Sequence, residues 1–108
     1  MFRPMAKPAV IAKLTCQDGK RAEAIKAFGE MFDHVRSNES GTLVYALHED
    51  AGDPNVLYFY ELYEDDDAFK SHGASDTMKA VGRNLREYMA GRPELTMLRP
   101  VQAKGIDF

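Results

Sequence analysis

The sequence predicts an α+β domain with the element order β-α-β-β-α-β, a ferredoxin-like sandwich of two helices on a four-stranded antiparallel sheet. Four segments carry the apolar pattern of strands, and two longer stretches carry apolar residues at helical spacing. These segments follow one another in the order that this fold requires. A right-handed crossover then places both helices on one face of the sheet, which leaves the other face uncovered.

The first half of the chain predicts a strand, a helix and a second strand. Residues 9–16 alternate with a period of two, as a strand does, and a Gln-Asp-Gly turn follows them. Apolar residues then recur at helical spacing over residues 20–37, where Asp18 is placed to cap the first turn. Strand alternation resumes over residues 42–49.

The second half predicts a strand, two helical stretches and a last strand. After a turn, residues 56–63 form a strand rich in aromatic side chains. The acidic residues behind it favour a helix start, and this short helix is expected to run to His72. A second helical stretch, with Asp76 as its cap, ends near Gly91, and residues 95–101 complete the sheet.

Length and composition indicate one globular domain. The chain has 108 residues, of which 44% are hydrophobic and 29% charged, and this excludes a disordered tail. We expect a single domain over residues 1–108, with its core at about 8–102 and a C-terminal tail at 103–108. The formal net charge of -3 argues against nucleic acid as a partner, because phosphates require a basic surface. The longest apolar run has five residues, against ~20 for a membrane span, so we expect no membrane partner.

Cysteine and histidine usage bears on location and cofactors. Cys16 is the single cysteine, and the N-terminal MFRPMAKP lacks the apolar core of a secretory signal. These features predict a cytoplasmic location. His34, His48 and His72 lack the paired spacing of metal ligands, and no glycine-rich phosphate-binding turn occurs, so we expect neither a metal nor a nucleotide cofactor.

The strand at residues 56–63 predicts a homodimer. Its side chains are large on both parities, although the helices can cover only one face of the sheet. The simplest cover for the other face is a second copy of the same sheet. The alternative is a monomer whose half-open sheet holds a ligand. Ile106 and Phe108 lie beyond the last strand, so we expect the tail to dock on the partner copy.

A series of landmarks between residues 40 and 101 resembles the antibiotic biosynthesis monooxygenase family. They occur in this order: Gly41 and Tyr45 at the start of a strand, Asp53-Pro54 in a turn, the strand end Tyr60-Glu61-Leu62-Tyr63, then Ala68-Phe69 and His72. The resemblance implies a dimeric α+β barrel with a pocket between each sheet and its helices. It also implies, for the best-known branch, oxygenation of phenols or quinols without metal or flavin.

That chemistry requires a base, because triplet oxygen reacts slowly with closed-shell molecules until a phenol is deprotonated. His72 is the leading candidate, since an imidazole has an ordinary pKa near ~6.5. The alternative is a structural histidine that ties its helix to a carboxylate such as Glu61. Tyr63 can stack on a planar substrate or donate its hydroxyl, and its alternative is core packing.

Four further residues complete the candidate site. Glu61 shares a strand parity with Phe59, and both are expected on a buried face near the substrate. Glu61 can orient His72 or act as a base, and the alternative is a buried ion pair with Lys13 or Arg99. Tyr45 is a secondary pocket candidate. Lys13 is a candidate for binding substrate.

His34 and the single cysteine have simpler expected roles. His34 is expected on the solvated side of the first helix. Cys16 is expected to be a small buried hydrophobic residue.

Two other branches of this family differ in chemistry. The haem-degrading branch uses an asparagine and an iron-ligating histidine at positions that align with Ala12 and Gly82, so haem is not expected. The branch that isomerises a phosphorylated sugar resembles this chain from Glu61 to His72, with Lys13, Arg99 and Arg83 as the available cations. Three functions therefore stay open: a cofactor-independent monooxygenase of a small aromatic substrate, a sugar-phosphate isomerase, and a non-catalytic small-molecule-binding dimer.

Overall fold

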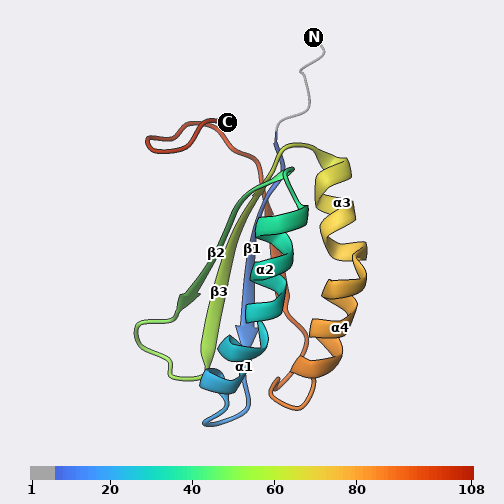
Figure 1. The fold of residues 1–108 in the computed structure, drawn as a ribbon. Helices are drawn as coiled ribbons and strands as arrows, with labels where there is room; N and C mark the ends of the chain where they lie inside the picture. Colours follow the sequence, from blue (N-terminus) through green and yellow to red (C-terminus); the bar gives the residue numbers. More distant parts are fainter. Residues whose placement is uncertain (1–6) are drawn as a thin grey trace.

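The computed structural model describes residues 7–108 as a four-stranded antiparallel sheet with helices packed on one face (Figure 1). The strands are β1 (Ala9–Thr15), β2 (Thr42–Glu49), β3 (Val56–Tyr63) and β4 (Glu94–Leu98), in the order β2-β3-β1-β4. The helices are α1 (Arg21–Ala27), α2 (Gly29–Asn38), α3 (Asp66–Ala74) and α4 (Asp76–Leu85). The predicted α+β ferredoxin-like class is confirmed. Most of the N-terminal segment on which the predicted location rests, residues 1–6, lies outside the described residues.

Two strands match their predicted bounds and the other two end earlier. β1 ends at Thr15 rather than at residue 16, because Cys16 forms only an isolated bridge with Met89. β2 and β3 begin and end at the predicted residues. The prediction of a last strand over residues 95–101 is wrong, because β4 ends at Leu98. Leu98 pairs with Ala9, the first residue of β1, so the ladder has no further partner there. Pro100 follows two residues later and has no N–H to donate.

The first predicted helix is divided in two at Phe28. The Phe28 N–H lies 3.2 Å from the carbonyls of both Ala24 and Ile25, which tightens the turn, and Gly29 then begins α2. Asp18 does not cap this helix, contrary to the prediction. Its carboxylate accepts a hydrogen bond from Asn55 Nδ2 at 3.3 Å, and no side chain of residues 7–108 caps α1.

Side chains cap both helices of the second half. Asp65 accepts from the Ala68 N–H at 2.8 Å at the acidic start of α3. Ser75 accepts from the Met78 N–H at 3.0 Å and is the cap of α4, whereas Asp76, the predicted cap, is the first residue of that helix. α4 ends at Leu85 rather than near residue 91, and turns connect it to β4.

The core lies between the helices and one face of the sheet. Alternate residues of β1 and β3 point toward the helices, and paired examples are Ala12 with Phe59 and Leu14 with Leu57. Phe28 packs edge-on against Phe59 with ring centroids 4.9 Å apart. Cys16 is buried in this core, as predicted. The same alternation turns Glu61 and Tyr63 toward the helices, which sets the position of the site.

The outer face of the sheet carries the opposite parity of β3. Tyr58 and Tyr60 are half-buried there, and Ile11, which pairs with Tyr60, is 37% exposed. The C-terminal segment extends past the end of the sheet, and Phe108 is 39% exposed (Figure 1). The homodimer and the docked tail therefore stay predictions. None of the helices within residues 7–108 has the length and apolar character needed to cross a bilayer.

Candidate active site

His72 lies in the last turn of α3, and its side chain is buried against the sheet. The close approach of α3 to the start of β2 depends on Gly41. A Cβ atom at Gly41 would lie only 2.7 Å from the Cβ of Ala68, and the Gly41 carbonyl accepts the Glu64 N–H at 2.8 Å. The absence of a side chain at this position therefore allows α3 to lie where His72 reaches the sheet.

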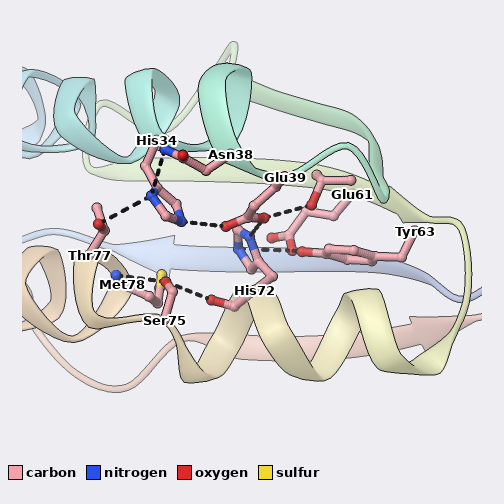
Figure 2. Close-up of polar contacts among 10 residues, drawn as sticks. His34, Asn38, Glu39, Glu61, Tyr63, His72, Ser75, Thr77 and Met78 are labelled. Carbon is pink, nitrogen blue, oxygen red and sulfur yellow. Dashed lines mark hydrogen bonds and ion pairs between the residues drawn. The ribbon is translucent and has the colours of Figure 1, made fainter.

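Two carboxylates flank the His72 ring (Figure 2). Nδ1 lies 2.7 Å from Oε1 of Glu39, which follows α2, and Nε2 lies 3.9 Å from Oε1 of Glu61 on β3. The Thr42 hydroxyl also donates to Glu39 Oε1, at 2.7 Å. The expected contact of His72 with Glu61 is thus present at longer range, and the direct hydrogen bond goes to Glu39.

Glu61 is a buried carboxylate whose pKa is raised, chiefly because burial disfavours its charged form. A hydrogen bond from the Tyr63 hydroxyl and the neighbouring His72 oppose this shift. Glu61 forms no ion pair with Lys13 or Arg99 among residues 7–108, so that alternative is wrong. Tyr63 is fully buried, and burial together with the charge of Glu61 raises its pKa, which keeps the phenol a neutral donor.

Aromatic rings surround the imidazole. The centroid of His72 lies 5.0 Å from that of Tyr45 and 5.4 Å from that of Tyr63. Tyr45 stacks on Phe59 at 4.7 Å, and Phe69 of α3 contacts Tyr63 edge-on at 5.3 Å. Burial raises the pKa of Tyr45, and the charges of the two nearby carboxylates add to the effect. Tyr45 and Tyr63 therefore shield these sides of the His72 ring from solvent.

His34 belongs to the same polar cluster, so its prediction as a solvated surface residue is wrong. Its Nε2 lies 3.1 Å from Glu39 Oε2, and its Nδ1 lies 3.3 Å from the Thr77 hydroxyl and 3.4 Å from Asn38 Nδ2. The side chain is 23% exposed. α4 packs beside α2, and this contact, which helical periodicity does not show, brings Thr77 to the ring.

A cavity of about 820 Å³ opens between the sheet and the helices. Four of the six predicted site residues line it: His72, Glu61, Tyr45 and Phe59. Most of its other wall is apolar, with side chains such as Val10, Leu14, Met78, Leu85 and Leu95. This volume lies within the range of pockets that bind small molecules.

Two predicted site residues do not line the cavity. Tyr63 lies behind Glu61 and touches the site through its hydroxyl. Lys13 lies on the outer face of the sheet, where it pairs with Tyr58, so the strand itself separates it from His72. Within residues 7–108, no group of three or more His, Cys, Asp or Glu side chains has an arrangement that holds a metal ion.

Sequence reasoning missed Glu39. The residue lies in the short break between α2 and β2, where no periodicity marks it. A signal was available in the topology, because the antiparallel pairing of β2 with β3 joins Thr42 to Tyr63. Residues just before Thr42 must therefore lie near the end of β3, where Glu61 was already a candidate.

The family follows from comparison with known sequences. A sequence model described as antibiotic biosynthesis monooxygenase matches residues 9–84, most of the sheet and all four helices except the end of α4. The chain belongs to the antibiotic biosynthesis monooxygenase family. The family resemblance expected from the sequence is thus confirmed. The comparison with curated proteins gives no match.

Solved structures agree with this family assignment. A protein of Caulobacter crescentus, described as a candidate antibiotic biosynthesis monooxygenase, is 37% identical, with a TM-score of 0.85 over 90% of this chain and 92% of its own. Proteins of Pseudomonas aeruginosa and Mycobacterium tuberculosis share the fold. Their identities are 21% and 24%, both TM-scores are 0.80, and they cover 94% and 91% of this chain and 100% and 98% of their own.

The positions expected for a haem-degrading member both lie in the cavity wall. They are Ala12 on β1 and Gly82 on α4. Neither a methyl group nor a hydrogen can ligate iron. The donor chemistry at these positions therefore does not fit haem.

Proposed function

We propose that this protein is a cofactor-independent monooxygenase that oxidises a small planar phenol or quinol in the cavity beside His72. The observation that carries the proposal is a buried imidazole in the wall of an apolar cavity, with Nε2 on the side of Glu61 rather than of Glu39. Such a group can take a proton from a phenol that lies against it.

The reaction balances without an added reductant. His72 takes the phenol proton, and the electron-rich anion then reduces and traps molecular oxygen at a ring carbon. One oxygen atom stays on the product, the other leaves as water, and the electrons come from the O–H and C–H bonds of the substrate. The protein supplies the base, the orientation and a dry environment.

The cavity wall supports a planar substrate. Tyr45 and Phe59 form a stacked aromatic wall next to His72, against which a flat ring can pack. Glu61, with its raised pKa, is available as a hydrogen-bond partner for a substrate oxygen, and Tyr63 holds it in place. We assign His72 as the base, Glu61 and Tyr63 as the orienting pair, and Tyr45 and Phe59 as the substrate wall.

A homodimer and a cytoplasmic location belong to the same proposal. The outer face of β3 presents Tyr58 and Tyr60, which a second sheet would cover. Cys16 is buried with a free thiol, and burial raises its pKa, as suits a protein of a reducing compartment.

The sugar-phosphate isomerase remains the second candidate, because Glu61, Tyr63 and His72 come together as that branch requires. The cavity favours the monooxygenase, since its wall is mainly apolar and Lys13 lies on the other face of the sheet. The cations that do line it are Lys70, Arg86 and Arg92, and all three are exposed.

The proposal can be tested by measuring oxygen uptake with a panel of hydroquinones, naphthols and anthrols. The protein is first treated with a chelator and freed of flavin. We expect uptake with at least one planar phenol and a fall of ~100-fold or more in His72→Ala, the loss expected when a general base is removed. Ser71→Ala, at an exposed position next to His72 on α3, is the control. A requirement for added metal or flavin, or full activity in His72→Ala, contradicts the mechanism. Turnover of a sugar phosphate favours the isomerase, and binding of phenols without any uptake favours the non-catalytic binder.

A further inference from the structure

The Glu39 carboxylate lies between two histidines that come from different helices (Figure 2). Its Oε1 faces His72 Nδ1 at 2.7 Å, and its Oε2 faces His34 Nε2 at 3.1 Å. The side chain of Glu39 is 11% exposed, so water screens these contacts little. One buried carboxylate therefore interacts with a ring of the site and with a second ring nearer the surface.

The hydrogen bonds determine the tautomer of His72. Oε1 accepts from the Thr42 hydroxyl, and a carboxylate has no proton of its own to donate to Nδ1. Nδ1 must therefore carry the hydrogen that joins it to Glu39. The neutral ring then has its lone pair on Nε2, the nitrogen on the side of Glu61. This is the nitrogen that a base in the cavity has to use.

His34 is oriented by its own neighbours. The Asn38 amide nitrogen is a donor and lies 3.4 Å from His34 Nδ1, so in the neutral ring Nδ1 accepts and Nε2 carries the hydrogen. Glu39 Oε2 is the carboxylate oxygen near Nε2. The 3.1 Å contact has the distance of an ion pair but not the direction of a hydrogen bond, and Oε2 has no hydrogen-bond partner within residues 7–108. The negative charge of Oε2 is thus available to a protonated His34.

We propose that Glu39 is the positioning residue of this site: it holds His72 in the Nδ1–H tautomer and supplies the counter-charge for its protonated form, and His34 competes for the same charge. The proposal about rate rests on the proposed function, in which His72 is the base. The proposal about the tautomer rests on the contacts alone. The arrangement follows the general pattern in which a carboxylate behind an imidazole fixes its orientation.

Within the described residues 7–108, four titratable groups face His72. They are Glu39 after α2, Glu61 and Tyr63 on β3, and Tyr45 on β2. Removing the charge of Glu39 makes protonated His72 less favourable, so the acid limb of the activity profile should move to lower pH. Removing His34 eliminates the positive charge that its protonated form would place beside Glu39, so the acid limb should move to higher pH. These opposite directions are not expected of a purely structural pair.

Histidine ring ¹⁵N NMR of the substrate-free wild type tests the tautomer directly. We expect His72 to have a protonated Nδ1 and an unprotonated Nε2 at a pH where the ring is neutral. Glu39→Gln keeps an amide oxygen as acceptor and should keep this tautomer, whereas Glu39→Met should lose the preference. An Nε2–H tautomer in the wild type, or an unchanged preference in Glu39→Met, overturns the proposal. The wild-type and Gln spectra decide the question even if the Met variant does not fold.

Kinetics with the phenol that gives the fastest oxygen uptake test the effect on rate. We expect Glu39→Gln to lower kcat by about 10- to 100-fold with little change in KM, which is typical of a residue that orients a functional ligand. Glu30→Gln, an exposed carboxylate on α2, is the control and should leave kcat unchanged. Wild-type kcat in Glu39→Gln with an unmoved pH profile overturns the proposal. If no phenol supports uptake, the proposed function fails, and the NMR result still decides the role of Glu39.

Discussion

His72 Nδ1 lies 2.7 Å from Glu39 Oε1, although the two residues are 33 positions apart in the chain. Their contact joins the end of α3 to the loop that leads into β2. It buries a carboxylate beside an imidazole, and Oε1 of Glu39 has both the ring and the Thr42 hydroxyl as hydrogen-bond partners. Substitutions in the strands and helices around this pair therefore test how the site is built.

Glu61→Gln should change how stability depends on pH. The pKa of Glu61 in the folded chain is raised above its ordinary value near ~4.3, so the folded chain binds more protons than the unfolded chain in that window. The contribution of Glu61 to stability is thus present below the ordinary pKa and is lost as the pH rises through the folded pKa. We expect the stability of Glu61→Gln relative to wild type, measured by urea unfolding, to increase from pH ~4 to pH ~8. A difference that is independent of pH, as we expect for Glu30→Gln, would contradict this.

Gly82→Leu should block the cavity without harming the fold. A Cβ atom at Gly82 would meet no atom of residues 7–108 within 4 Å, and the residue lines the cavity from α4. Replacing glycine inside a helix also gains up to about 1 kcal/mol of helix propensity. We expect the thermal midpoint to be equal or higher while calorimetry shows loss of phenol binding. Gly29→Ala, at the exposed start of α2, is the control that should bind normally.

Gly41→Ala should move α3 away from the sheet. The added Cβ would lie 2.7 Å from Ala68 Cβ, closer than two methyl carbons can approach. Overpacking of this kind costs about 1–3 kcal/mol, which chemical denaturation can measure. Ala68→Gly removes the second methyl group, so the double variant should be less destabilised than the sum of the two single changes. Simple additivity would show that the two residues do not meet.

Tyr60→Glu should separate the proposed dimer. Tyr60 lies on the outer face of β3, and a carboxylate there would lose its hydration against a second sheet. Sedimentation should give about twice the chain mass of 12.1 kDa for the wild type and the mass of one chain for the variant. Ser37→Glu, on the exposed side of α2, should remain a dimer. A wild-type monomer at micromolar concentration would remove the basis for this prediction.

Deletion of residues 104–108 tests the proposed contact of the tail with the partner copy. Phe108 is 39% exposed and Ile106 is half-buried in the single chain, so both have apolar surface left to bury. We expect a lower thermal midpoint for the dimer after deletion. Replacing Lys104 and Asp107 with serine, which keeps both apolar residues, is the control. An unchanged midpoint in the deletion variant would count against docking.

Local patterns predicted the strands better than the site. β2 and β3 have strong alternation and clear turns at both ends, so their bounds followed directly from sequence. The sequence could not decide whether Ser75 or Asp76 caps α4, because both residue types cap helices and only the backbone geometry selects one.

The site was predicted only where a single strand carries it, because contacts between elements leave no local pattern. Strand parity places Glu61 on the same face as Phe59. It also places Lys13 on the face opposite Ala12, which argues against the prediction of Lys13 as a substrate-binding residue. Glu39 and His34 depend on contacts between α2, α3 and the start of β2, and no single element carries a pattern that reports them.

The order β2-β3-β1-β4 has a consequence for synthesis of the chain. β1 is the first strand to leave the ribosome, yet it is a central strand, and its two neighbours come from residues 56–63 and 94–98. It has no local partner, since a helix pair and β2 intervene before β3 appears. Both ladders of β1 must therefore wait for later parts of the domain, and the second waits until residues 94–98 have emerged. Contacts so distant in sequence slow folding. The central strand of this small domain is therefore not paired on both sides until β4 has been synthesised.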